Sequence, residues 1–211
     1  MTTSPKRLVV GITGSSGVLL GVRLLQLLRP LDTIETHVVI SKWGLRTLHL
    51  ETDFGKEDIE RLADHFYPAG DMGAAISSGS FITSGMVVIP CSMRSLAAIA
   101  SGTGQNLVHR AADVTLKERR QLVLVPRETP LHQIHLQHLL TLARMGVTIM
   151  PPMLAFYHRP ETVSDLVDQV VMRVLDQLGI HLDITARWNP TESPAPSSAN
   201  DLDANTAERE P

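Results

Sequence analysis

Residues 7–28, RLVVGITGSSGVLLGVRLLQLL, decide the fold of this chain. Residues 7–13 form a short apolar run that ends in glycine, isoleucine and threonine, which is typical of a buried strand. Glycines recur at every third residue from Gly11 to Gly17 and mark a tight turn after that strand. Residues 17–28 are apolar on nearly every side of a helix, so we expect this helix to be buried all round, against its own sheet and a second subunit.

The rest of the chain repeats this alternation of strand and helix. We expect further strands at residues 36–41, 86–90, 121–126 and 147–150, and helices at residues 43–51, 57–65, 96–102, 131–145 and 163–178. This order predicts an α/β fold class, a Rossmann-like (flavodoxin-like) parallel sheet with helices on both faces, in a single domain over residues 1–188. Residues 189–211 are rich in Pro, Ser, Ala, Asp and Glu and predict a disordered acidic tail, because they hold too little apolar surface to order themselves.

The composition excludes several classes of function. With 211 residues, a net charge of -3 and only 4% aromatic residues, the chain lacks the basic or aromatic face of a nucleic-acid binder. No apolar run is long enough to cross a bilayer, and no signal peptide is visible before the first strand. The single cysteine, Cys91, excludes an intrachain disulfide and suits a reducing compartment, so we expect a cytoplasmic protein.

Two strand-to-helix turns could bind an anion. In residues 11–17, free backbone N–H groups and a helix dipole come together, although the spacing is neither a dinucleotide fingerprint nor a P-loop. A tight turn that needs small residues for packing is an equally good explanation. Residues 90–95 offer hydroxyls and amides at a second helix start, and within them Cys91 is better explained as a buried apolar residue than as a nucleophile.

Residues 110–130 carry the most informative charge pattern. Arg110 and Lys117 lie seven residues apart and therefore on one face of a helix, where they suit a phosphorylated ligand. Arg127 and Glu128 follow the strand at residues 121–126, at the end where α/β proteins bind ligands. Glu128 is a general acid, a charge partner or an ordinary surface carboxylate. Two more arginines, Arg119 and Arg120, are expected to face water at the end of the helix.

Other candidates lie in the second half of the chain. Tyr157 can donate its phenol to a phosphate or cap the core, and Arg173 lies beside the apolar stripe of the last helix, where arginines usually extend to solvent. Residues 132, 135 and 138 are histidines on one helix face. No Cys, Asp or Glu lies among them at ligand spacing, so we expect no metal site.

These segments together resemble the UbiX-type flavin prenyltransferases, formerly described as aromatic-acid decarboxylases. The resemblance extends from about residue 7 to residue 188. It is carried by residues 11–17, 40–42, 51–53, 78–80, 90–92, 106–107, 110–120, 122–130, 156–160 and 187–188, of which the block 110–130 is the most specific.

The resemblance implies a flavoprotein that transfers a dimethylallyl group from dimethylallyl monophosphate to N5 and C6 of reduced FMN, without a metal. The product would be the prenylated FMN cofactor of a UbiD-type decarboxylase. The family assembles as a homododecamer with sites between subunits. The resemblance implies that FMN is held by Gly14, Ser15, Ser16, Ser41, Ser92, Ser95 and Arg127, with Met93 and Arg94 contributing mostly backbone. It places Arg110, Lys117, Glu128, Tyr157 and Arg173 around the prenyl phosphate, Trp188 as a residue closing the site from a neighbouring chain, and Ser16 with Glu51 as a proton relay near N5.

Two other functions fit the same fold. One is a carrier that binds FMN without chemistry, and the other is a flavin-dependent cysteine decarboxylase. The decarboxylases rely on a histidine after the first helix and on an Asn-containing substrate motif, and neither is found at the matching places.

Overall fold

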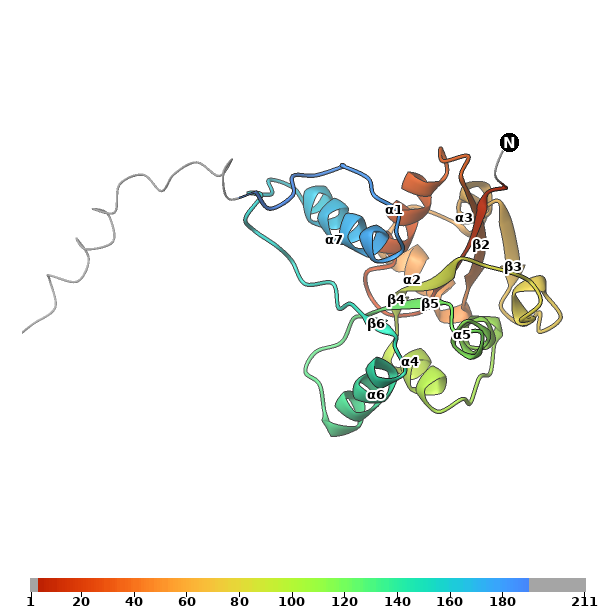
Figure 1. The fold of residues 1–211 in the computed structure, drawn as a ribbon. Coiled ribbons are helices and arrows are strands. Elements are labelled where there is room, and N and C mark those ends of the chain that lie inside the picture. Colours follow the sequence, from red (N-terminus) through yellow and green to blue (C-terminus); the bar gives the residue numbers. More distant parts are fainter. Residues whose placement is uncertain (1–3, 190–211) are drawn as a thin grey trace, which may run out of the picture.

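The protein is described here by a computed structural model that covers residues 4–189 (Figure 1). The tail expected at residues 190–211 lies outside this range. The strands are β1 (Lys6–Ile12), β2 (Ile34–Ile40), β3 (His65–Pro68), β4 (Gly85–Cys91), β5 (Gln121–Pro126) and β6 (Thr148–Ile149). The helices are α1 (Val18–Leu28), α2 (Lys42–Glu51), α3 (Lys56–Leu62), α4 (Met93–Ala100), α5 (Leu107–Lys117), α6 (Gln133–Arg144) and α7 (Val163–Gln177), with a short 3-10 helix η1 (Ala75–Ser77).

The strands form one parallel sheet in the order β3-β2-β1-β4-β5-β6. The chain builds outward in one direction from β1 to β3 and then restarts on the other side of β1 with β4. The neighbouring strands β1 and β4 therefore form the topological switch point, and α/β proteins bind ligands beyond the carboxyl ends of the strands at this point.

Helices cover both faces of the sheet, as the sequence predicts (Figure 1). On one face α1 and α7 contact each other, and Leu24 and Val174 are completely buried in the core between them and the sheet. On the other face α4, α5 and α6 bury Leu96, Val108 and Leu142 in a second core. The two cores hold the strands in the middle of a three-layer α/β fold.

Helix α1 is buried largely by its own chain. Its backbone runs so close to β4 that a Cβ atom at Gly21 would lie 2.6 Å from the carbonyl oxygen of Ile89. Leu19, with 36% of its surface exposed, is the main departure from the expected burial all round. Because the sheet, α2, α3 and α7 cover the rest, a second subunit is not needed to explain the apolar sequence of this helix.

The structure differs from the sequence prediction at α3, β3 and η1. The helix expected to reach residue 65 ends at Leu62, and β3 follows as an edge strand that the sequence did not predict. The change of direction is fixed by Asp64, whose carboxylate accepts hydrogen bonds from the backbone N–H and hydroxyl of Thr36 at 2.8 and 2.9 Å. The contact ties the chain after α3 to β2. In addition, Ala75–Ser77 form the short helix η1, which the sequence did not predict.

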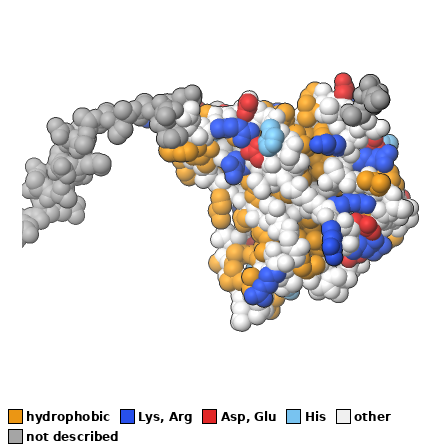
Figure 2. All heavy atoms as spheres, in the orientation of Figure 1, with side chains coloured by type: hydrophobic (Ala, Val, Ile, Leu, Met, Phe, Trp, Pro, Cys, Tyr) orange, Lys and Arg blue, Asp and Glu red, His pale blue; other side chains and the backbone are white. Residues whose placement is uncertain are grey.

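The molecule exposes a group of large hydrophobic side chains on α6 and on the segment after β6. Figure 2 shows hydrophobic side chains over this part of the surface. They include Ile134, Leu136, Leu140, Met153, Leu154 and Phe156, each at least half exposed. An exposed apolar surface of this kind is typical of contacts between subunits.

Candidate functional site

A cleft of about 400 Å³ opens at the carboxyl ends of β1, β2 and β4. It lies at the switch point of the sheet, where the fold predicts a ligand. Five of the nine residues predicted to bind the flavin line it, namely Gly14, Ser41, Ser92, Arg94 and Ser95. The prediction missed five others, which are Lys42, Trp43, Gln105, Asn106 and His109.

Gly14 is needed because α2 approaches the end of β1 very closely. A Cβ atom at position 14 would lie 2.3 Å from Cβ and 2.9 Å from the carbonyl carbon of Trp43. Only glycine allows this approach, which brings the first turn of α2 against the glycine turn. Trp43 is 64% exposed at the edge of the cleft.

Two helices begin at the cleft, and each is capped by a serine. The hydroxyl oxygen of Ser41 accepts a hydrogen bond from Gly44 N at 3.0 Å, and that of Ser92 accepts one from Ser95 N at 3.2 Å. Helix N-termini carry partial positive charge and free N–H groups, and Lys42 and Arg94 add full charges beside them. The cleft is therefore suited to an anionic group such as a phosphate.

Thr13 fixes the two halves of the sheet to each other at the cleft. Its hydroxyl donates to the carbonyl oxygen of Pro90 at 2.9 Å and accepts from the backbone N–H of Ser92 at 2.7 Å. Thr13 is 1% exposed. These bonds set the position of the α4 N-terminus relative to the glycine turn.

Four predicted flavin residues do not line this cleft. The Ser15 hydroxyl donates to the carbonyl oxygen of Arg127 at 3.3 Å, which places the glycine turn beside the end of β5. Ser16 is exposed in the same turn, whereas Met93 is buried in the core beneath α4. Ser15, Ser16 and Arg127 thus extend the site from the cleft toward β5.

Glu51 reaches the glycine turn from the end of α2. One carboxylate oxygen accepts hydrogen bonds from Gly17 N at 2.8 Å and Val18 N at 3.1 Å. Helix α1 has no acidic residue in its first turn and no side-chain cap at Gly17. Glu51 therefore caps α1 from another helix, next to Ser16, with which it was predicted to act.

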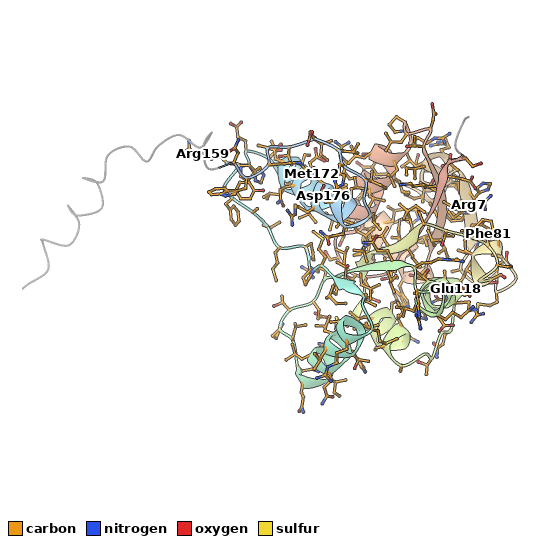
Figure 3. The ribbon with its side chains drawn as sticks, viewed as in Figure 1. Arg7, Phe81, Glu118, Arg159, Met172 and Asp176 are labelled. Carbon is orange, nitrogen blue, oxygen red and sulfur yellow. The ribbon has the colours of Figure 1, made fainter. Side chains whose placement is uncertain are left out.

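The predicted residues around the prenyl phosphate form two separate groups within one chain. Arg110 and Lys117 lie on α5, where Arg110 donates to Ser77 O at 3.2 Å and pairs with Asp113, and Lys117 pairs with Glu118. On the other side of the molecule Tyr157 contacts Trp188 edge to face, with ring centroids 5.4 Å apart. Figure 3 shows Glu118 and Arg159, which lie next to these two groups, far apart on different sides of the molecule.

The other two members of the predicted set are accessible. Arg173 is exposed on α7, and Glu128 is exposed directly after β5, where its carboxylate accepts from Thr129 N at 3.1 Å. Helix α7 packs on the opposite face of the sheet from α5, so one copy of the chain holds Arg173 apart from Arg110 and Lys117. A single site that contains all of them requires more than one copy.

The expectation for Arg120 is wrong. Arg119 is exposed, but Arg120 is half-buried and donates to the carbonyl oxygens of Gly79 and Phe81 at 2.6 and 2.9 Å. Its guanidinium thus holds the loop after η1 against the end of α5. The contact depends on the position of the loop at residues 79–81, which is distant in the sequence, so the local charge pattern around Arg120 could not predict it.

A cluster of possible metal ligands lies outside the cleft, on the neighbouring strands β2 and β3. The ligand atoms of Glu35, His37 and His65 all lie within 4.8 Å of one another. However, one Glu35 carboxylate oxygen already lies 2.9 Å from His37 Nε2, 3.3 Å from His65 Nε2 and 3.4 Å from the Arg7 guanidinium, and the two imidazoles stack with planes 13° apart. The contacts describe a hydrogen-bonded, stacked cluster. Sequence reasoning considered only the histidines of α6 and overlooked it.

Comparisons with known proteins show the family to which the chain belongs. The family model Flavoprotein matches residues 1–175. A probable UbiX-like flavin prenyltransferase of Streptomyces sp. (strain D7) is 56% identical over 86% of this chain and 91% of its own length. In the described part of the chain, no helix is long and apolar enough to cross a membrane.

Two solved structures resemble the chain over nearly their whole length. The dodecameric FMN-dependent UbiX-like decarboxylase from Escherichia coli O157:H7 has a TM-score of 0.86 at 55% identity, over 87% of this chain and 99% of its own. AnUbiX (PadA1), in complex with FMN and dimethylallyl pyrophosphate, has a TM-score of 0.86 at 48% identity, over 88% of this chain and 98% of its own.

Proposed function

The chain belongs to the UbiX-like flavin prenyltransferases of the Flavoprotein family, and on this premise we propose that it transfers a dimethylallyl group from dimethylallyl monophosphate to N5 and C6 of reduced FMN. The observation that carries the proposal is the cleft at the switch point, where two helix N-termini, Lys42 and Arg94 converge. This arrangement recognises a phosphate attached to a larger ligand.

The residues of the cleft fit FMN. Ser41, Ser92 and Ser95 would hold the phosphate at the N-termini of α2 and α4, with backbone contributions from residues 93 and 94. The glycine turn and Arg127 would face the flavin ring, because the bond from Ser15 to Arg127 joins them on that side of the cleft. When bound and reduced, FMN supplies the nucleophilic atoms of the reaction.

The second anion site would take the prenyl phosphate. Arg110 and Lys117 would come from one copy of the chain, and Glu128, Tyr157 and Arg173 from others, since one copy holds the two groups apart. The dodecameric relative at 55% identity supports a homo-oligomer of this kind, and the exposed apolar surface of α6 suits it. We propose a homododecamer in which Trp188 closes the site.

Charge stabilisation drives the proposed reaction. Lys117 and the arginines would stabilise the negative charge that develops on the departing phosphate, and stabilisation of this kind usually contributes most to the rate enhancement. A monophosphate carries less charge than a diphosphate, so these cations suffice without a metal. Glu128 would protonate the phosphate and later take the proton from C6, while Ser16 and Glu51 would relay a proton near N5.

The product would be a cofactor for another enzyme. We propose that prenylated FMN passes to a UbiD-type decarboxylase and that the reaction takes place in the cytoplasm. Identity of 56% to a protein described as a flavin prenyltransferase favours this function over a flavin carrier or a cysteine decarboxylase.

One anaerobic assay tests the proposal. Reduced FMN is supplied with dimethylallyl monophosphate or with the diphosphate, and the bound flavin is weighed by mass spectrometry. A gain of one C5H8 unit is expected with the monophosphate. An unchanged flavin would indicate a carrier, and CO2 release from a cysteine peptide would indicate a decarboxylase.

Variants locate the chemistry in the same assay. Lys117→Ala is expected to lower the rate about a hundredfold to a thousandfold, by analogy with the loss of one preorganised donor. The control is Lys56→Ala, because Lys56 is likewise paired with a neighbouring carboxylate but lies on α3. Equal rates in the two variants would contradict the role given to Lys117.

A further inference from the structure

His109 is a buried residue of the cleft with no role so far. It lies in the first turn of α5, which Asn106 caps by accepting from His109 N at 3.1 Å. Only 5% of the residue is exposed, and its imidazole lines the cleft beside Ser95 and Gln105. A buried histidine at an anion site would be expected to carry a proton for the anion, but its hydrogen bonds indicate a different task.

The contacts of the ring fix which nitrogen carries the proton. The backbone N–H of Gln105 donates to Nδ1 of His109 at 3.3 Å, so Nδ1 is an acceptor. Burial lowers the pKa of His109, and the nearby Arg94 lowers it further, which favours the neutral ring at physiological pH. Because Nδ1 carries no hydrogen and accepts this bond, the neutral ring carries its hydrogen on Nε2.

The Nε2–H group in turn fixes the hydroxyl of Ser95. His109 Nε2 lies 3.1 Å from Ser95 Oγ, and the Ser92 hydroxyl donates to the same oxygen, also at 3.1 Å. A serine oxygen accepts two hydrogen bonds, so both acceptor positions of Ser95 are filled. The Ser95 hydroxyl can therefore only donate its own hydrogen to a further partner. Because Ser95 lines the cleft, that partner would be a ligand in the cleft.

We infer that His109 is a positioning residue that holds the Ser95 hydroxyl as a hydrogen-bond donor to the flavin phosphate, and that it thereby sets the preference of the cleft for FMN over a flavin without phosphate. The inference rests on the proposed function, because it takes the phosphate of FMN as the group bound at α4. A donor locked in this way favours a group that only accepts, and its bond to a charged oxygen is stronger than its bond to a neutral one.

Two replacements of His109 separate this role from a structural one. Asn places an acceptor near the position of Nδ1 and keeps the contact to Gln105, but it has no donor that reaches Ser95. Gln places an amide N–H near the position of Nε2 and keeps the donor to Ser95. If His109 only supported the loop before α5, Asn would be the better replacement. If His109 positions the Ser95 hydroxyl, Gln would be the better replacement.

The test measures dissociation constants of FMN and riboflavin by flavin fluorescence for the full-length oligomeric protein. His109→Asn is expected to weaken FMN binding about tenfold, which corresponds to the loss of one such hydrogen bond, and to change riboflavin binding by less than about threefold. His109→Gln is expected to stay within about threefold of the wild type for both flavins. Equal weakening of both flavins by His109→Asn, or a larger loss in Gln than in Asn, would overturn the inference.

A second pair of variants covers the possibility that the loop itself moves. In a Ser95→Ala background the hydroxyl is gone, so His109→Asn is expected to have no further effect on FMN affinity. The same tenfold loss in that background would overturn the inference while leaving the proposed function intact. A wild-type protein that binds neither flavin would instead overturn the proposed function, and the inference with it.

Discussion

Removing the carboxylate of Glu51 should destabilise the whole fold, although this residue is exposed near the surface of α2. Its carboxylate accepts from Gly17 N and Val18 N at 2.8 and 3.1 Å, and α1 has no other side-chain cap. Loss of a cap costs about 1 kcal/mol, and loss of a negative charge at a helix N-terminus costs about 0.3–1 kcal/mol more. Because α1 packs against both the sheet and α7, its end cannot fray independently of the core.

We therefore expect Glu51→Ala to lower the free energy of unfolding by about 2 kcal/mol. Glu51→Gln should cost about half as much, because the amide oxygen still accepts but carries no charge. The measurement is urea unfolding followed by circular dichroism at one fixed protein concentration, since assembly makes stability depend on concentration. Glu60→Ala is the matched control, because Glu60 is paired only with Lys56 on the surface of α3, and it should change stability by less than about 0.5 kcal/mol.

A Glu51→Ala protein as stable as the Glu60→Ala control would refute this reasoning. The Gln variant also separates the two roles of Glu51. If Glu51 only caps α1, Glu51→Gln should prenylate FMN at the wild-type rate under conditions in which the variant is fully folded. A folded Glu51→Gln protein that binds FMN but does not prenylate it would support the proton relay.

Three further predictions concern other parts of the fold. Gly14→Ala brings a methyl carbon to 2.3 Å from a neighbouring side-chain carbon, so it should lower the free energy of unfolding in urea by about 1–3 kcal/mol and abolish flavin binding measured by fluorescence. The control is Gly70→Ala, which has open space around its Cβ position and should fold and bind flavin like the wild type. Burial raises the pKa of Cys91 to about 12, so a thiol reagent at neutral pH should label it only as fast as the protein unfolds, and rapid labelling of the native protein would contradict its burial. The hydrogen bond from Arg187 holds the pKa of Asp176 below its ordinary value, so the pair stabilises the fold fully above the ordinary pKa of an aspartate and the stabilisation is lost as pH falls through the lower value. Asp176→Asn should thus be less stable than the wild type near neutral pH and show a smaller loss of stability on acidification, and an unchanged pH profile would show that the pair contributes nothing.

The sequence predicted the parts of the fold that follow from local pattern. The strand at residues 121–126 was placed at its observed bounds, because an apolar run there ends in proline. The last helix was predicted to start at residue 163, and a capping box of Thr162 and Asp165 begins α7 there. Strand β3 was missed because its four residues, HFYP, are half-exposed at the edge of the sheet and show no alternation of apolar and polar side chains.

The candidate site was predictable where it follows strand ends, and less so elsewhere. Ser92 could be placed because it directly follows a buried strand, whereas Ser41 was assigned to the flavin only through the family resemblance. Lys42 and Trp43 come immediately after Ser41, and attention to the whole first turn of the helix would have found them. His109 gave no such signal, since its position in the cleft depends on how the loop before α5 folds back over α4.

The distance between the α5 cations and the Tyr157–Trp188 pair has a genetic consequence. If each reaction centre contains Lys117 from one copy and Glu128 from another, two different inactivating substitutions should complement each other. Chains carrying Lys117→Ala and chains carrying Glu128→Gln, produced together in one cell, would form mixed oligomers. Some of their reaction centres would contain an unchanged Lys117 from one chain and an unchanged Glu128 from the other. Activity in the mixture would then exceed the low activity of either parent, whereas mixing two chains with the same defect would restore nothing.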